Sequence, residues 1–186
     1  MVATDQLVVG CMDAIAEKDP RGAVREVLEQ AVASRRLVDA FGNPTAGLNV
    51  LHNAPDLTVL NVVWPPLFSL YPHDHRMWAA ICIYSGREDN AFYIRRDETI
   101  VSSGGKELLE GDVQLLGDDV IHAVHNPART YTGAIHVYGG DFIAKPRSQW
   151  DAETLEEQPY DLSTVRREFE MAESRFKAHR TDSGHP

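Results

Sequence analysis

Cysteine is scarce in this chain. Only two of its 186 residues are cysteines, Cys11 in a predicted N-terminal helix and Cys82 in an apolar run. A small secreted domain stabilised by disulfides needs more cysteines, so this count argues against a disulfide framework and favours a reducing compartment. We therefore expect a cytoplasmic protein.

Long apolar runs and an excess of basic residues are also missing. The longest strongly apolar stretch, Met77 to Tyr84, is far shorter than the ~20 residues of a membrane-spanning helix, and the first residues lack the layout of a signal peptide. The 28 acidic residues outnumber the 18 lysines and arginines, which gives a formal charge of -10. Such a surface repels nucleic acid and anionic lipid, so we expect neither as a partner.

The hydrophobic pattern divides the chain into three zones. Helical spacing dominates residues 1–44, where Pro20 can open a second helix, and it returns over 160–180. Between them, over 50–145, short β-rich runs alternate with turn signals, as in a small barrel or jelly roll. The length supports one core and not two, so we predict a single, mainly β domain over 1–186 with helices at both ends.

Histidines with metal-ligand spacing stand out in the strand-rich zone. His73 and His75 are separated by one residue on a predicted strand, so their side chains point to the same face. His122 lies in a later apolar, strand-like run and can supply a third ligand. Imidazole suits Fe, Zn, Cu and Ni, so the ligand type leaves the metal open.

This arrangement resembles the cupin superfamily. The two cupin motifs are matched at six positions: His73, His75, Gly86, Gly111, His122 and Asn126. Ala79 or Ala80 stands where the first motif usually has a glutamate ligand. A cupin with three histidines and no carboxylate resembles the cysteine dioxygenase and 3-mercaptopropionate dioxygenase family, whose first motif also begins HDH.

The resemblance implies a fold, a cofactor and a reaction. The fold would be a cupin-type double-stranded β-helix, or jelly-roll barrel, with N-terminal helices and a C-terminal helix. Fe(II), bound by the three histidines, would serve an oxidoreductase, a dioxygenase of the bacterial thiol dioxygenase branch. Its expected partners are O2 and a small-molecule substrate, a thiol and most simply a thiol carboxylic acid, which would become a sulfinate. The oligomeric state is left open.

The same resemblance names candidate catalytic residues. The family carries a Ser-x-His-x-Tyr trio, which is matched here by His136 and Tyr138, with Ala134 in the serine position. The pair would donate and accept hydrogen bonds beside the metal, although Ala134 cannot orient His136 as a serine would. Cys82 is displaced from the position at which some relatives crosslink a cysteine to the tyrosine, so we expect no crosslink.

Two further residues are candidates for substrate binding. Arg147 is similar in placement to an arginine of the mercaptopropionate branch, and a guanidinium suits a carboxylate through two parallel hydrogen bonds. The alternative for Arg147 is a surface arginine paired with nearby carboxylates. Trp78 follows the ligand pair by three residues and would wall the pocket. His52 stands where the cysteine-specific branch has its own arginine, and is not equivalent to it.

Two other classes of function stay open. One is a cupin enzyme that uses Ni, Mn, Zn or Fe at the same histidines on a non-thiol substrate, since one fold hosts many reactions. The other is a non-catalytic binder of a small molecule or metal. The substitutions at His52 and Ala134 favour the first of these, and the retained His136 and Tyr138 count against the second.

Overall fold

The computed structural model describes residues 3–42 and 44–182. In this part of the chain, helices lie near both ends: α1 (Ala3–Ala14), α2 (Pro20–Ala33), α3 (Arg36–Ala40) and α4 (Leu162–Asp182). The strands lie between them: β1 (Gly47–Asn53), β2 (Thr58–Trp64), β3 (Ser69–Asp74), β4 (Ala79–Ser85), β5 (Arg87–Arg96), β6 (Thr99–Leu109), β7 (Val113–Leu116), β8 (Ile121–His125), β9 (Thr132–Tyr138), β10 (Ser148–Trp150) and β11 (Glu157–Pro159).

The strands form two antiparallel sheets that enclose the main core. One sheet has the order β1-β2-β9-β4-β7, and the other has the order β11-β10-β3-β8-β5-β6. The prediction of a mainly β double-stranded β-helix with N-terminal helices and a C-terminal helix is confirmed. The strands run from Gly47 to Pro159, beyond the expected 50–145 on both sides. The last two strands have three residues each, too few for a periodic sequence pattern.

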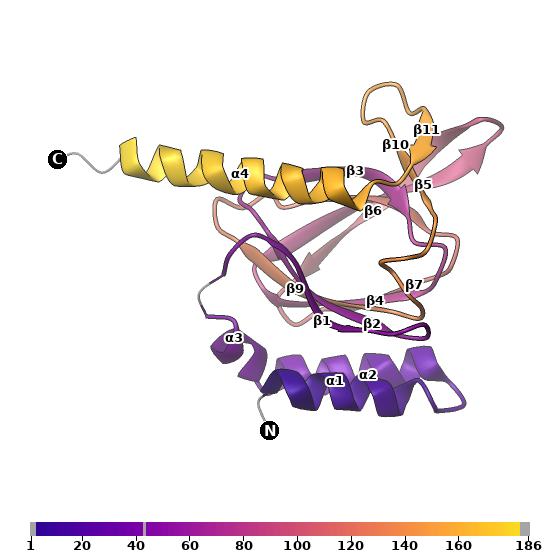
Figure 1. Cartoon of the computed structure of the whole chain (residues 1–186), viewed down its shortest axis with the longest axis vertical. Helices are drawn as coiled ribbons and strands as arrows, with labels where there is room; N and C mark the ends of the chain where they lie inside the picture. Colours follow the sequence, from indigo (N-terminus) through magenta and orange to yellow (C-terminus); the bar gives the residue numbers. More distant parts are fainter. Residues whose placement is uncertain (1–2, 43, 183–186) are drawn as a thin grey trace.

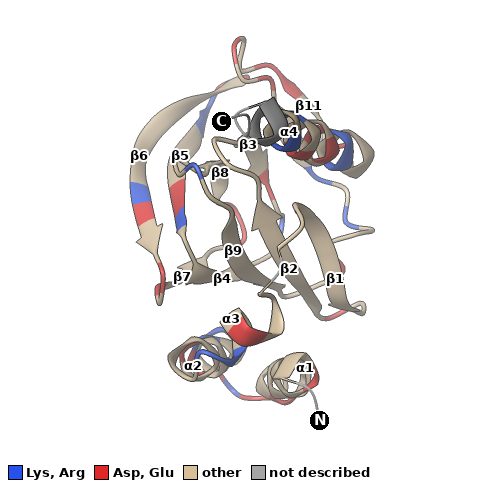
Figure 2. Cartoon of the chain, turned by 90° about the vertical axis from the view of Figure 1, so that its left-hand side faces the viewer, with Lys and Arg blue, Asp and Glu red and all other residues tan. Residues whose placement is uncertain are grey.

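The five-stranded sheet is covered on both faces. Along β9, Ala134 and Tyr138 point into the core between the sheets, whereas Ile135 and Val137 point toward the N-terminal helices. This alternation follows from the period-two geometry of a strand. All seven residues of β9 are consequently buried, and none of the five strands carries an Asp, Glu, Lys or Arg (Figure 2).

Helices cover the barrel on two opposite sides (Figure 1). α1 and α2 pack on the outer face of the five-stranded sheet through Cys11, Val24 and Leu28, each fully buried. α4 crosses the other side and sends Val165 and Phe169 into the core between the sheets. The C-terminal helix is therefore part of the wall that surrounds the barrel interior.

α4 begins at a well-formed cap. The carboxylate of Asp161 accepts a hydrogen bond of 2.9 Å from the backbone N–H of Ser163 and a second of 2.7 Å from the Thr164 hydroxyl. Hydrogen bonds to the Thr164 and Ser163 side chains lower the pKa of Asp161 to about 2. The anionic cap satisfies backbone donors that have no partner inside the helix.

Candidate metal centre

Three histidines from two neighbouring strands meet inside the barrel. His73 on β3 lies directly opposite His122 on β8, and His75 follows immediately after the end of β3. Their side chains are buried, and Nε2 of His75 is 3.3 Å from Nε2 of His73 and 3.2 Å from Nε2 of His122. The structure thus brings together the three residues that the sequence predicts as metal ligands, here called the three-histidine cluster.

Hydrogen bonds on the far side of the rings set the tautomers of two of these histidines. Nδ1 of His73 is 3.1 Å from the carbonyl oxygen of Tyr71, and Nδ1 of His122 is 2.6 Å from Oδ1 of Asn90. The Asn90 amide is oriented by its Nδ2, which donates to Oε1 of Glu88 at 3.0 Å. Both partner oxygens can only accept, so each Nδ1 carries the proton and each Nε2 keeps a lone pair.

Burial keeps the imidazoles of the cluster neutral. Desolvation lowers the pKa of His73 to about 4 and holds the pKa values of His75 and His122 well below their usual range. The positive charge of Arg147 acts in the same direction on His73 and His75, with a smaller effect. Neutral imidazole is the form in which histidine binds a metal ion.

The spacing of the cluster fits one metal ion. Nitrogens that lie about 2.0–2.1 Å from a shared ion at tetrahedral angles are about 3.3–3.4 Å apart. The separations of 3.3 and 3.2 Å are close to this value. Ala79 and Ala80, the two candidates for the position of the missing glutamate, are both buried and carry no ligand atom, so three neutral nitrogens make up the donor set. They can hold a divalent ion and leave further coordination positions open.

The two candidate catalytic residues lie beside the cluster. His136 and Tyr138 of β9 both line the small cavity around the three histidines. Nδ1 of His136 is 3.1 Å from the Tyr138 hydroxyl, and the Tyr138 ring centroid is 5.0 Å from that of His75. Burial raises the pKa of Tyr138 above its usual value, so the hydroxyl stays protonated. This pair reaches the site from the five-stranded sheet, whereas the ligands come from the six-stranded sheet.

Sequence reasoning missed a buried carboxylate in this site. Glu88 of β5 is 0% exposed and points into the barrel. Its Oε2 accepts a hydrogen bond of 2.7 Å from Nε1 of Trp64 and lies 3.5 Å from Nε2 of His136. The sequence GRED is typical of a turn, so Glu88 is not recognised as a strand residue. On strand β5, however, Glu88 and Asn90 are two residues apart and point to the same face.

Arg147 is buried beside the site rather than exposed on the surface. Its side chain stacks on the rings of Phe142 and Tyr160, with Cζ 3.9 Å from each ring centroid. Nη1 donates to the carbonyl oxygens of Phe142 and Lys145, while Nε and Nη2 are buried without a hydrogen-bond partner. The alternative of a surface arginine paired with carboxylates is therefore wrong. Phe142 and Tyr160 line the small cavity around the cluster, so Arg147 lies directly behind its wall.

The expectation that Trp78 walls the pocket is wrong. Trp78 packs with the residues between the five-stranded sheet and the N-terminal helices and does not line the cavity around the cluster. β3 ends at Asp74, and Arg76 adopts a left-handed conformation with φ of 55°. This turn leads from one sheet to the other, and Trp78 is an odd number of residues from His75, so strand alternation does not place it on the face of the ligands.

Two other sequence expectations have clear outcomes. Cys82 is fully buried on the helix side of β4, whereas Tyr138 faces the core between the sheets, so the two cannot be crosslinked. His52 lies on β1 and does not line the cavity around the cluster.

No helix in the described part of the chain is both long and apolar enough to span a membrane.

The cavity around the three-histidine cluster is very small. Its volume is about 10 Å³, which is room for one water-sized molecule. Tyr160 and Val165, just before and within the first turn of α4, form part of its wall. A larger molecule reaches the cluster only when side chains at this wall move.

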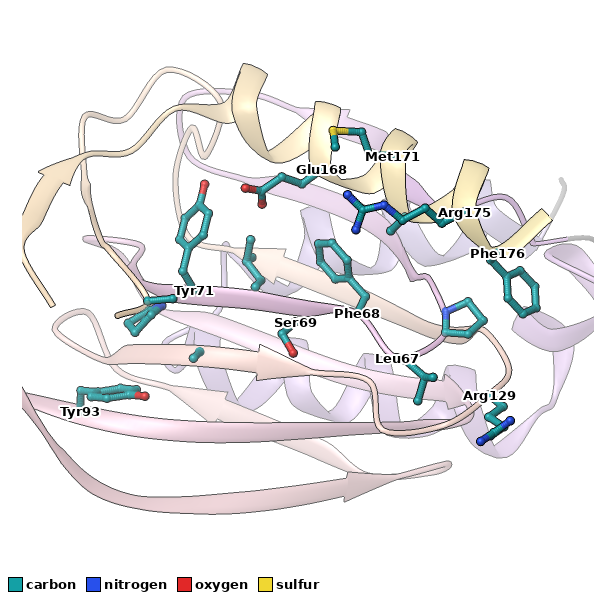
Figure 3. A pocket seen from close by; sticks show the side chains of 16 residues that line it. Leu67, Phe68, Ser69, Tyr71, Tyr93, Arg129, Glu168, Met171, Arg175 and Phe176 are labelled. Atoms are coloured by element: carbon teal, nitrogen blue, oxygen red, sulfur yellow. The ribbon is translucent and has the colours of Figure 1, made fainter. Parts of the chain in front are cut away.

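A separate and larger groove runs between α4 and the outer side of β3. Its volume is about 910 Å³, and Figure 3 shows Glu168, Met171 and Arg175 projecting over it from α4. Phe68 lies on the opposite side of the groove (Figure 3). The groove contains none of the residues that the sequence predicts as ligands or catalytic groups.

Comparisons with known proteins find only distant likenesses in structure. No protein-family model and no curated protein sequence matches the chain. A solved RmlC-like cupin family protein from Methanocaldococcus jannaschii, with a double-stranded β-helix fold, is 14% identical with a TM-score of 0.44; the match covers 53% of this chain and 83% of that one. A Klebsiella pneumoniae protein with a double-stranded β-helix domain is 16% identical with a TM-score of 0.44, and the match covers 56% of this chain and 82% of that one. A Bacillus halodurans protein is 15% identical with a TM-score of 0.49, covering 56% and 77%.

Proposed function

We propose that the protein is a non-haem iron(II) dioxygenase that oxidises a small thiol carboxylic acid to its sulfinate with O2. The proposal rests on one observation: three neutral histidines converge on one point with no carboxylate among them and a buried arginine behind the wall. When bound there, a ferrous ion would supply Lewis-acid and redox chemistry to a substrate thiolate and O2. Both oxygen atoms of O2 enter the product, so the thiol and O2 balance the sulfinic acid without a further reductant.

Arg147 would recognise the carboxylate of the substrate. Its Nε and Nη2 are buried and have no hydrogen-bond partner. A carboxylate can accept two parallel hydrogen bonds from such a pair of guanidinium N–H groups. Tyr160 stacks on the guanidinium and also lines the cavity, with its ring centroid 5.7 Å from that of His73. A shift of the Tyr160 side chain would therefore enlarge the cavity and uncover the two free N–H groups together.

His136 and Tyr138 would hold and move a proton beside the reacting atoms. The protonated Tyr138 hydroxyl can donate a hydrogen bond to an oxygen or sulfur atom of the substrate, or to His136. The buried aromatic rings around the pair exclude bulk water from the site. We further propose that the enzyme acts in the cytoplasm, with O2 and a small molecule as its partners and without nucleic acid or membrane.

A second candidate function is a three-histidine metal enzyme that acts on a non-thiol small molecule. One observation favours it: His136 faces the carboxylate of Glu88 rather than a serine hydroxyl, which makes its surroundings unlike those expected from the thiol dioxygenase trio. A binder without turnover is the remaining alternative.

Oxygen consumption tests the proposed reaction. The protein is loaded anaerobically with Fe(II) and mixed in turn with cysteine, 3-mercaptopropionate, mercaptosuccinate and cysteamine, while mass spectrometry follows the gain of two oxygen atoms. We expect uptake with at least one carboxylated thiol. Full iron loading without uptake on any thiol would exclude the thiol dioxygenase and leave the second candidate.

Substitution of Arg147 tests the proposed anchor. In Arg147→Ala, the loss of a charge-assisted hydrogen-bonded pair should lower kcat/KM for a carboxylated thiol by about 10- to 100-fold, or roughly 1.5–3 kcal/mol. Cysteamine has no carboxylate and serves as the control substrate. An equal loss for both substrates would mean that Arg147 stabilises the wall and does not recognise the carboxylate.

A further inference from the structure

Glu88 is a buried carboxylate surrounded by N–H donors. Among the described residues it has no Lys or Arg within ion-pair distance. Its neighbours are Nε1 of Trp64 at 2.7 Å, Nδ2 of Asn90 at 3.0 Å and Nε2 of His136 at 3.5 Å. Burying a carboxylate costs several kcal/mol unless its oxygens are well hydrogen-bonded, so this arrangement calls for a specific role.

One branch of the network leads from Glu88 to a proposed metal ligand. Oε1 of Glu88 accepts from Nδ2 of Asn90, which leaves Oδ1 of Asn90 facing the ring of His122. Oδ1 can only accept, so His122 must donate from Nδ1 and present the lone pair of Nε2 to the cluster. The orientation of an amide two residues along β5 thus depends on the Glu88 carboxylate.

The other branch leads to His136. Oε2 of Glu88 accepts from Trp64 and lies 3.5 Å from Nε2 of His136, which has no other hydrogen-bond partner. A carboxylate beside Nε2 favours the tautomer that carries its proton there. Nδ1 of His136 then accepts from the Tyr138 hydroxyl at 3.1 Å. The three groups lie in the order Tyr138, His136, Glu88.

We infer that Glu88 is a positioning residue for both halves of the site. It fixes the metal-binding tautomer of His122 through Asn90. It also orients His136 toward Tyr138, which Ala134, at the position of the serine, cannot do. The inference rests on the proposed metal centre and is independent of the substrate oxidised there.

The first test uses the unmodified protein. Nitrogen-15 NMR of the histidine rings at neutral pH, with the metal-free and Zn²⁺-loaded protein, reports which ring nitrogen carries the proton. We expect the Nε2–H tautomer for His136 and the Nδ1–H tautomer for His122. An Nδ1–H tautomer for His136 would overturn the assignment, because Nε2 would then face the carboxylate without a proton between them.

The second test is Glu88→Gln. A glutamine offers one accepting oxygen, and Trp64 can be satisfied only if the NH2 group turns toward Asn90. The Asn90 amide must then flip and present its own NH2 to His122, which favours the wrong tautomer for binding a metal. We expect the affinity for Co²⁺, measured by chelator competition, to fall about 10- to 100-fold.

Controls separate this role from general destabilisation. Asp89→Asn changes the next residue of β5, whose carboxylate pairs with Arg87, and should leave Co²⁺ affinity unchanged. Asn90→Ala should weaken binding, and the double variant Glu88→Gln/Asn90→Ala should lose no more than Asn90→Ala alone, because both act through one link.

The outcomes are distinct from those of the proposed oxidation. Unchanged Co²⁺ affinity in Glu88→Gln, or losses that multiply in the double variant, would overturn the inference. An absence of thiol oxidation in the unmodified protein would leave it standing, since no readout here measures turnover. If Glu88→Gln does not fold, the histidine tautomers of the unmodified protein decide the question.

Discussion

At the scale of single residues, the polar groups inside the barrel depend on one another. The Nδ1 atoms of His73 and His122 each meet an accepting oxygen, and Nε2 of His136 meets the carboxylate of Glu88. Each contact fixes a proton on one nitrogen and a lone pair on another. Protonation of a buried imidazole therefore disrupts the arrangement of the cluster as well as adding a buried charge.

The metal-free protein should lose stability as the pH falls from about 6.5 toward 4. Burial lowers the pKa of His73 from 6.5 to about 4, so in this window the unfolded chain binds a proton that the folded chain does not. Acid then favours unfolding, by about 2 kcal/mol at pH 5 from His73 alone. Urea unfolding at pH 7.5 and pH 5 measures the difference.

Two acid-sensitive carboxylates act at lower pH and can be separated from the effect of the histidines. The pKa values of Glu157 and Asp161 are lowered to about 2 by hydrogen bonds to their neighbours, so their contribution is lost mainly below pH 4. His73→Asn should reduce the loss of stability between pH 7.5 and pH 5 by about 2 kcal/mol, and the rest of the loss comes from His75 and His122, whose pKa values burial also lowers. Equal stability of the unmodified protein at pH 7.5 and 5 would contradict the prediction.

At the scale of secondary-structure elements, α4 closes the barrel with an aromatic contact. Phe169 is 2% exposed, and its ring centroid lies 4.7 Å from that of Phe68 and 5.2 Å from that of Trp64. Trp64 in turn donates to Glu88. Helix packing and the polar network of the site therefore share one side chain.

Phe169→Ala should lower the free energy of unfolding by about 3–5 kcal/mol, because it removes a buried ring and leaves a cavity. Met171→Ala on the same helix is the matched control: Met171 is 54% exposed, and its truncation should change stability by no more than about 0.5 kcal/mol. Urea denaturation of both variants measures this. A similar, small effect for both would mean that α4 packs loosely on the barrel.

Sequence reasoning predicts most elements of this fold and fails at specific places. β2, β4 and β9 carry no Asp, Glu, Lys or Arg and are mostly apolar, and they are predictable because both of their faces are buried. β10 and β11 are not, since three residues carry no periodic pattern. The expectation for Trp78 fails because the residue is an odd number of positions from His75 and lies beyond the turn between the sheets.

At the scale of the whole molecule, metal binding should couple to stability. An ion that binds the folded chain alone stabilises it by about 2.7 kcal/mol when its free concentration is 100 times the Kd, which should raise Tm by roughly 5–10 °C for a chain of this size. Thermal unfolding with and without Co²⁺ tests this. His122→Ala should lose most of the shift, whereas His125→Ala, on the same strand but outside the cluster, should keep it. A full shift in His122→Ala would remove that residue from the ligand set.

The site itself is predictable from sequence only in part. His73, His75 and His122 can be identified because strand alternation and motif spacing place them on one face. Glu88 and Asn90 cannot, since their role depends on β5 pairing with β8, which sets Asn90 beside His122 in space. The burial of Arg147 is equally hidden, because the aromatic rings that cover it lie five residues before it and thirteen after it.

The division of the site between the sheets has a practical consequence for anyone who purifies this protein. The proposed ligands His73 and His122 lie on the six-stranded sheet and His75 directly follows β3, whereas His136 and Tyr138 belong to the five-stranded sheet. A preparation can therefore carry its full complement of metal and still be inert, if the two sheets have shifted against each other. Metal analysis reports only on the three histidines that would bind the ion. Sample quality should therefore also be judged by a spectroscopic signal from His136 or Tyr138.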